Sequence, residues 1–461
     1  MSANFSFIEE ATSAPRNSTY DYIIVGGGTA GCAVGATLSS KANVLVLERG
    51  GSPYSNTTKI RKESFISTLT DTSPDSFSQA FISEDGVPNN RARVLGGGTA
   101  INVGFYSRAE PLFIRQLGLD EALVEDSYKW VERKLVYRPN LLQWQSAVRN
   151  GLLEAGVLPY NGFTYHHING TEIGGTILDR NGNRHTAADL LDGIGPTSQL
   201  EPLGIEVVLN QTMVGQGMGD PPSNGLLIPS PLPIELTLAT TVGITKFGSY
   251  IESACGYDFA ALYGSASQTQ TQTLPNDLTA AFNKTGESSM ANPITNLGNI
   301  LETIRGPISK GYLELRNTNA SDNPKVTFNY FQAPEDLRRC VQGMETLINV
   351  VNSKSFSPFR YRNTTTQDLL NMVLNQRLNH RNSTVTSLEQ FCRDTVNTLW
   401  HYHGGCLVGN VVDRDYKVFG VESLRVIDAS TFSFSPGTNP QATVMMLGRY
   451  MAIRILESRR R

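Results

Sequence analysis

Three glycines in the spacing G-x-G-x-x-G constrain the fold of this chain most: Gly26, Gly28 and Gly31. They follow a short β-branched run, Tyr20–Val25, and lead into small residues at helical spacing that continue to Leu38. A second apolar run, Val44–Leu47, comes next. Strand, glycine turn, helix and strand in close succession predict a βαβ unit.

The same glycines predict a ligand. Gly26 makes the tight turn, Gly28 lets the backbone approach a pyrophosphate group, and Gly31 allows the helix to pack closely on the strand. The amino end of the helix offers free N–H groups and a partial positive charge to the phosphates. Glu48 ends the second strand, where its carboxylate can accept hydrogen bonds from ribose hydroxyls. The unit therefore predicts a dinucleotide site, without separating FAD from NAD.

Composition and charge exclude several classes of protein. The chain has 461 residues with 39 basic and 42 acidic side chains, which is unlike the basic footprint of a nucleic-acid-binding protein. That length suits two or three domains. No stretch approaches the ~18 consecutive apolar residues of a membrane span. Five cysteines without paired spacing give no sign of a metal site. We expect a soluble multidomain protein with no nucleic-acid partner, no membrane span and no metal.

Three further stretches carry a resemblance to a known family. Residues 92–102 read ARVLGGGTAIN, residues 400–405 read WHYHGG, and residues 436–441 read PGTNPQ. Together they are similar to the signatures of the glucose–methanol–choline (GMC) oxidoreductases, and they look most like the plant branch that contains HOTHEAD proteins and mandelonitrile (hydroxynitrile) lyases. The resemblance covers nearly the whole chain and implies that the cofactor is FAD.

The resemblance implies a fold that combines an α/β part with an α+β part. A Rossmann-like FAD-binding domain would be discontinuous, formed by residues 20–212 and 391–461. A substrate domain of antiparallel sheet and helices would occupy residues 213–390. The apolar run Leu424–Asp428 predicts a buried strand of the FAD-binding domain.

Smaller signals refine this outline. Prolines at 221–222 and 229–233 indicate a crossover between the two domains. The polar stretch 265–273 predicts an exposed loop, and residues 1–19 predict a surface leader. Helices are expected over residues 120–155, 335–352, 384–399 and 442–456.

By the same resemblance, this chain lacks a segment of the FAD-binding domain that other family members have. Family members carry a further long segment between the motif at residues 184–191, RHTAADLL, and Gly193–Pro196. That segment supplies strands of the sheet and contacts to the adenine side of FAD. One reading of this chain is therefore a truncated, catalytically impaired family member.

The resemblance also implies a reaction. His401 matches the histidine that takes the hydroxyl proton of an alcohol while hydride passes to flavin N5, and Asn439 matches the position that holds a second histidine or an asparagine. A hydroxynitrile lyase is the alternative, but those enzymes use two histidines and a tyrosine where this chain has Asn439 and Leu399. His403 would point away from His401 in an extended strand, so the two would not share a metal. We expect an alcohol substrate, with a long-chain ω-hydroxy fatty acid suggested by the HOTHEAD likeness, and a monomer.

The cofactor-binding residues implied by the match are spread over the motifs named above: Gly26, Gly28, Thr29, Ala30, Gly31, Glu48, Arg49, Val94, Gly97, Thr99, Asn102, Val103, Gly104, Phe105, Trp400, Asp428, Ala429, Pro440 and Gln441.

Compartment is indicated by the same likeness. Cys340 and Cys392 resemble a disulfide pair of the plant lyases, and the plant branch is typically secreted. Sequons for N-glycosylation occur at nine positions: Asn4, Asn17, Asn56, Asn169, Asn210, Asn283, Asn319, Asn363 and Asn382. No signal peptide is visible at the amino terminus. We expect an extracellular or secretory protein from the family likeness and the sequons.

Overall fold

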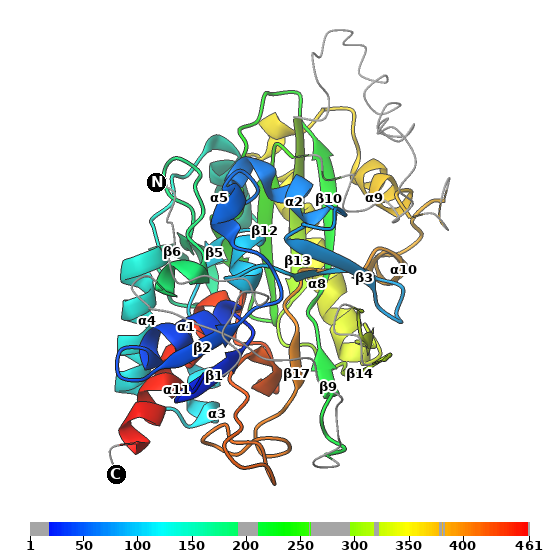
Figure 1. The fold of residues 1–461 in the computed structure, drawn as a ribbon. Coiled ribbons are helices and arrows are strands. Elements are labelled where there is room, and N and C mark those ends of the chain that lie inside the picture. Colours follow the sequence, from blue (N-terminus) through cyan, green and yellow to red (C-terminus); the bar gives the residue numbers. More distant parts are fainter. Residues whose placement is uncertain are drawn as a thin grey trace.

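The computed structural model describes residues 18–191, 211–257, 259, 296–317, 322–377, 380 and 383–459 (Figure 1). Most of the predicted leader, the Gly193–Pro196 motif and the polar loop at 265–273 lie outside these residues.

The glycine-rich unit forms as predicted. Strand β1 (Tyr22–Val25), helix α1 (Thr29–Leu38) and strand β2 (Val44–Leu47) follow one another, and the two strands pair in parallel. Gly26 has a φ of +97°, which only glycine adopts readily. A Cβ atom at Gly31 would lie 2.0 Å from the carbonyl oxygen of Gly26, so the helix can approach the turn only without a side chain there.

Helix α11 (Gln441–Ser458) packs on α1 and closes this half of the molecule. A Cβ atom at Gly448 would lie 2.7 Å from the carbonyl oxygen of Ala30, so this glycine lets the two helix backbones approach closely. Buried side chains such as Leu38 and Ile455 fill the contact. In Figure 1, α11 and α1 lie together with α4 (Glu121–Leu135) at the lower left.

A seven-stranded sheet forms the centre of the other half. Its order is β16-β10-β13-β12-β11-β7-β6, and all neighbours are antiparallel except β6 and β7. The strands are β6 (Tyr160–Phe163), β7 (Gly170–Ile173), β10 (Pro222–Pro229), β11 (Thr241–Ile244), β12 (Ser249–Cys255), β13 (Leu297–Ile304) and β16 (Asn397–Thr398). The sheet therefore includes strands from all three stretches of the predicted domain division.

Two helices cover one face of this sheet. Helices α5 (Gln143–Glu154) and α8 (Pro334–Asn352) contribute Trp144 and Leu347 to a core that also holds Leu227 and Ile251 of the sheet. Their positions confirm the expected helices over 120–155 and 335–352.

A four-stranded sheet continues from the first, in the order β15-β14-β9-β17. Its strands are β9 (Gln216–Gly219), β14 (Gly311–Glu314), β15 (Lys325–Thr327) and β17 (His403–Gly405). The chain passes from β9 into β10 through residues 220–221 and from β16 into β17 through residues 399–402. Because β9 pairs with β17 and β10 pairs with β16, both crossings between the sheets lie side by side.

The remaining elements are short. They comprise β3 (Ser78–Ile82), β4 (Pro88–Ala92), β5 (Phe105–Tyr106), β8 (Gly175–Thr176), α2 (Phe65–Leu69), α3 (Pro111–Leu117), α9 (Thr366–Leu374), α10 (Leu388–Asp394), and the 3₁₀ turns Pro53–Asn56, Lys62–Ser64, Gly97–Ala100, Ala187–Leu191, Ser357–Phe359 and Ala429–Thr431.

Three local predictions are wrong. The prolines at 222 and 229 bracket the fully buried strand β10, so of the residues 221–222 only Pro221 lies in a connection between the two sheets. The helix expected over 384–399 is only α10, because residues 397–398 pair with β10 as β16. Within the described residues Leu424–Asp428 form no strand of a sheet: Arg425 makes only an isolated bridge with Lys417, and the Val426 amide donates to the Tyr416 carbonyl oxygen.

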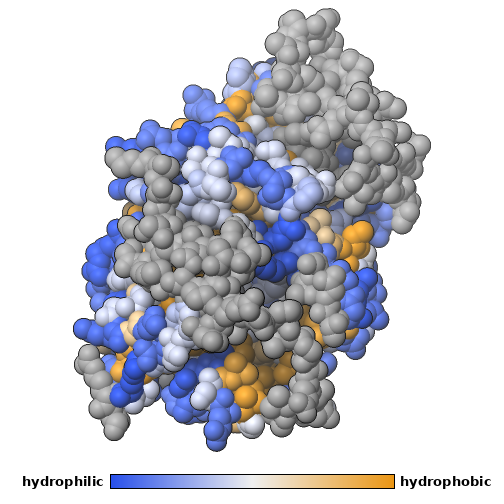
Figure 2. All heavy atoms as spheres, in the orientation of Figure 1, coloured by the Kyte–Doolittle hydropathy of each residue, from blue (hydrophilic) through white to orange (hydrophobic). Residues whose placement is uncertain are grey.

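The edge of β1 faces the same cavity as Leu424–Asp428. Within the described residues β1 pairs only with β2, and its Ile23 and Val25 side chains are 50% and 84% exposed. Leu424–Asp428 line this cavity too, and among the described residues Arg425 forms only an isolated bridge, with Lys417. Figure 2 shows that hydrophobic residues gather in the lower part of this face, the end at which β1 and β17 lie in Figure 1.

Cys340 of α8 and Cys392 of α10 form the predicted disulfide. None of the helices in the described part of the chain is long and apolar enough to cross a membrane.

Candidate active site

A cavity of about 750 Å³ runs from the amino end of α1 to the crossing between the two sheets. Most of the predicted site residues line it: Gly26, Gly28, Thr29, Ala30, Gly31, Asn102, Val103, Phe105, Trp400, His401, Asp428, Ala429, Asn439, Pro440 and Gln441. Motifs that lie more than 300 residues apart in the sequence thus meet around one space.

The other predicted residues lie behind this lining. The Glu48 carboxylate accepts hydrogen bonds from the amides of Gly27 (2.9 Å) and Gly50 (2.8 Å), which braces the glycine turn. Arg49 donates to Gln79 (2.8 Å) and faces a separate, smaller pocket.

The second glycine cluster packs directly on the first. Gly97 has a φ of +58°, and a Cβ atom there would lie 2.8 Å from the Cα atom of Gly28. Val94 is buried, the Thr99 hydroxyl accepts from the Ala187 amide (2.8 Å), and the Gly104 amide donates to Asn102 (2.8 Å). These residues hold the backbone that lines the cavity.

A buried amide pair ties this cluster to α11. Asn102 Nδ2 donates to Gln441 Oε1 (3.0 Å), and Gln441 Nε2 donates to the Phe105 carbonyl oxygen. The Arg184 guanidinium donates to Asn102 Oδ1 (2.9 Å), and its burial lowers its pKa to about 10. The amino end of α11, which begins at Gln441, therefore faces the cavity and brings a partial positive charge to it.

His401 lies at the other end of the cavity, with both ring nitrogens oriented. Its Nδ1 lies 3.2 Å from the Tyr250 hydroxyl, and its Nε2 lies 3.4 Å from Asn439 Nδ2. An amide nitrogen can only donate, so Nε2 carries the lone pair and Nδ1 carries the proton. Burial lowers the pKa of His401 to about 3. The imidazole is therefore neutral near pH 7 and presents Nε2 as a proton acceptor beside the Asn439 amide.

His403 does not share in this arrangement. Its Nε2 lies 2.8 Å from Lys310 Nζ and its Nδ1 lies 3.3 Å from the His401 carbonyl oxygen. Burial, and then the Lys310 charge, lower the pKa of His403 to about 3. His403 is thus a neutral, hydrogen-bonded residue of β17.

Three residues of this end were not predicted. Glu252 and Tyr250 lie on β12, and Asp220 joins β9 to β10. Glu252 lines the cavity and hydrogen bonds with Asn439, and burial raises its pKa to about 7. A glutamate inside the apolar run of residues 249–255 was the available signal for this site, whereas nothing in the sequence around Asp220 marked it.

The cavity fits an extended dinucleotide flavin. Gly28 borders the cavity, and a Cβ atom there would have no neighbour closer than 4.0 Å, which leaves room for a phosphate at the amino end of α1. Asn439 Oδ1 and Trp400 Nε1 are buried and lack a hydrogen-bond partner within the described residues. A ligand that reaches from α1 to His401 would pass both groups.

Comparison with known proteins agrees with this geometry. Residues 307–448 match the family described as GMC oxidoreductase. Protein HOTHEAD of Arabidopsis thaliana is 44% identical over 533 aligned positions that cover 96% of this chain and 89% of that protein. An (R)-mandelonitrile lyase-like protein of Arabidopsis thaliana is 41% identical, with 99% of this chain and 93% of that protein covered.

The fold has solved counterparts. A variant formate oxidase of Aspergillus oryzae, studied for FAD modification, superposes with a TM-score of 0.72 at 15% identity, covering 97% of this chain and 100% of that one.

The HOTHEAD alignment also bears on the predicted missing segment. Its 533 positions exceed the 461 residues of this chain, so the relative carries residues inside the aligned region that this chain lacks. With 44% identity across nearly its whole length, this chain belongs to the GMC oxidoreductases, a family of FAD-binding flavoproteins.

Proposed function

We propose that this protein binds FAD and oxidises an alcohol, with His401 as the proton acceptor. The observation that supports this most directly is the pair formed by His401 Nε2 and the Asn439 amide, 3.4 Å apart, at the end of the cavity opposite the glycine turn. A lone pair and an amide donor side by side can bind a hydroxyl group from both sides.

Three side chains would each have one role in the reaction. His401 Nε2 accepts the hydroxyl proton as the C–H bond of the carbinol breaks. Asn439 donates a hydrogen bond to the substrate oxygen, and Tyr250 holds His401 Nδ1 so that Nε2 faces the cavity. When bound, the flavin would supply the hydride acceptor.

The cofactor would be held along the cavity by backbone and side-chain groups. The amino end of α1 would bind the pyrophosphate, and Glu48 would support it from behind by holding the glycine turn through the Gly27 amide. Asn102 and Gln441 would support the flavin end together with the amino end of α11. That helix end favours negative charge on a reduced flavin.

A secretory location is part of the proposal. The Cys340–Cys392 disulfide is typical of proteins that fold in an oxidising compartment. Within the described residues the sequon asparagines Asn56, Asn169 and Asn363 are all exposed, so an N-glycan could be attached to each.

Anaerobic mixing of the purified protein with alcohols tests the reaction. We expect flavin absorption at ~450 nm that bleaches on addition of a suitable alcohol, with long-chain ω-hydroxy fatty acids and aromatic alcohols in the panel. In a His401→Ala variant the flavin spectrum should be unchanged, but the alcohol should reduce the flavin ~10²- to 10⁴-fold more slowly.

Two results would contradict the proposal in different ways. Cyanide release from mandelonitrile without bleaching by any alcohol would show a hydroxynitrile lyase, in line with the mandelonitrile lyase-like relative. A purified protein with no flavin bands, even after incubation with FAD, would show a truncated and inactive family member.

A further inference from the structure

The backbone around His401 is strained and held by two buried side chains. Trp400, which precedes it, has a φ of +62°, a conformation that residues other than glycine rarely adopt. The Trp400 amide donates to the Thr398 hydroxyl at 2.7 Å, and the His401 amide donates to Asp220 Oδ1 at 3.1 Å. Thr398 and Asp220 are 4% and 2% exposed.

The sheet topology explains why a side chain is needed there. Thr398 pairs with Pro222 in one sheet, and His403 pairs with Gly219 in the other. Between these pairs, four residues (399–402) lie opposite only two (220–221). The extra residues leave the regular ladder, so the His401 amide has no carbonyl partner on the neighbouring strand, and the Asp220 carboxylate takes that place.

Asp220 is itself fixed. Its Oδ2 accepts a hydrogen bond of 2.6 Å from the Tyr330 hydroxyl, and Tyr330 follows β15 in the four-stranded sheet. The aspartate therefore connects the segment that follows β15 to the turn that carries the imidazole. Displacement of the turn would move Nε2 relative to Asn439, and their 3.4 Å separation leaves little room for it.

We propose that Asp220 is a positioning residue that sets the place of His401 through its backbone amide; this inference rests on the proposed role of His401 as the proton acceptor. The carboxylate does not touch substrate. It acts by holding the strained turn at Trp400 in the conformation that points the imidazole into the cavity.

Two variants of Asp220 test this, each with two readouts. The first readout is amide hydrogen exchange of a peptide that includes residues 399–402, followed by mass spectrometry on the protein with and without added FAD. The second is the rate of flavin reduction by an alcohol. Asp220→Ala removes the acceptor, whereas Asp220→Asn keeps an oxygen that can accept from the His401 amide.

We expect Asp220→Ala to raise exchange of this peptide about tenfold or more and to slow flavin reduction ~10- to 100-fold. Asp220→Asn should restore both to within about threefold of the unmodified protein, which a purely structural loss of a buried group would not predict. Unchanged exchange in Asp220→Ala overturns the proposal. So does an Asp220→Asn variant that exchanges and reacts abnormally, and this result stays decisive should Asp220→Ala not fold.

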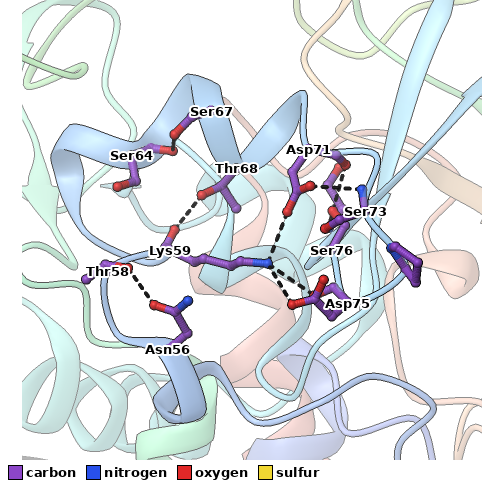
Figure 3. A network of polar contacts seen from close by, with 12 residues as sticks. Asn56, Thr58, Lys59, Ser64, Ser67, Thr68, Asp71, Ser73, Asp75 and Ser76 are labelled. Carbon is purple, nitrogen blue, oxygen red and sulfur yellow. Dashed lines mark hydrogen bonds and ion pairs between the residues drawn. The ribbon is translucent and has the colours of Figure 1, made fainter. Parts of the chain in front are cut away.

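A matched control separates a local from a general effect. Asp71, in the loop after α2, also accepts a backbone hydrogen bond, from the Ser73 amide at 2.9 Å, and contacts Lys59 at 3.1 Å (Figure 3). Asp71→Ala should leave exchange of the 399–402 peptide unchanged, and an equal rise there would overturn the proposal. If none of the tested alcohols reduces the flavin of the unmodified protein, the proposed function is wrong. The exchange data still decide whether Asp220 positions His401.

Discussion

Glu252 should make both stability and activity depend on pH near neutrality. Its side chain is 3% exposed, lines the cavity beside Asn439, and has one carboxylate oxygen, Oε2, with no hydrogen-bond partner in the described part of the chain. Burial raises its pKa from 4.5 to about 7. Replacement by glutamine keeps the shape of the side chain and removes the charge at every pH.

The size and sign of the stability effect follow from that shift. Below about pH 4.5 the carboxyl is protonated in both the folded and the unfolded chain, and its stabilising contribution is complete. As the pH rises toward 7, the unfolded chain loses this proton and the folded chain keeps it, so the contribution is lost. A rise of about 2.5 pKa units corresponds to about 3 kcal/mol. As the pH rises from 4 to 8.5, the free energy of unfolding of Glu252→Gln should therefore increase by about 3 kcal/mol relative to that of the unmodified protein.

Glu172 provides the matched control. It lies on β7, in register with Val242 of β11, which in turn is in register with Glu252. The two glutamates thus face the same side of the sheet, roughly 10 Å apart across two strand spacings. Burial raises the pKa of Glu172 to about 8, yet it does not line the cavity. Over the same pH range, the free energy of unfolding of Glu172→Gln should increase by about 5 kcal/mol relative to that of the unmodified protein.

Activity distinguishes the two glutamates. An ionised Glu252 next to Asn439 would favour a proton on His401, so kcat/KM for the alcohol should rise through about pH 7. That rise should disappear in Glu252→Gln and persist in Glu172→Gln. Guanidinium unfolding followed by tryptophan fluorescence at pH 4 and 8.5 measures the stabilities. A pH-dependent gain below about 1 kcal/mol for Glu252→Gln, or a retained inflection in its kcat/KM profile, would refute the reasoning.

Three further predictions concern other parts of the molecule. The disulfide joins residues that are 52 positions apart. By the loop-entropy relation, the double variant Cys340→Ala, Cys392→Ala should have a free energy of unfolding about 4 kcal/mol lower than the unmodified protein. Chemical unfolding measures this, and an unchanged unfolding midpoint would contradict it. Gly28→Val should leave the unfolding temperature within a few degrees, because a Cβ there meets nothing closer than 4.0 Å, while FAD absorbance falls. Secreted protein should lose mass on treatment with an N-glycosidase, and Asn363→Gln should lose one glycan relative to the unmodified protein.

The sequence allowed the glycine turn at one end of the cavity to be predicted more fully than the geometry around His401 at the other. Gly26, Gly28 and Gly31 act through backbone geometry that is local in the chain, so their spacing predicts the turn and the close approach of the helix that the structure has. His401 and Asn439 could be named from their motifs. Their mutual distance, however, depends on helix α11 and on the crossing between two sheets, which no local pattern specifies.

The residues that the sequence did not reveal act through long-range register. Glu252 reaches the cavity because β12 is an inner strand, paired with both β11 and β13, and the Glu252 side chain lies on the face toward the cavity. Asp220 reaches His401 because two crossings between sheets coincide. The failed prediction at Leu424–Asp428 has the same origin, because within the described residues this apolar run makes only an isolated bridge with Lys417 and joins no sheet.

The exposed edge of β1 bears on whether a shortened family member can work. A doubly wound sheet places the glycine-turn strand in its centre, with neighbours on both sides. Here β1 has one neighbour within the described residues, and Val25 is 84% exposed.

The flavin end of the cavity does not depend on that edge, because the packing of α11 on α1 and the Asn102–Gln441 bond hold it. A weakened cofactor domain should then lower the affinity for FAD and leave the rate per bound flavin intact. Truncation that abolished the reaction itself would instead require the His401–Asn439 pair to be displaced, and this pair is held by the crossing between β16 and β17 and by the segment that leads into α11. Titration of FAD against activity therefore separates the two cases: activity that saturates at high FAD with a normal rate per flavin indicates weak binding alone.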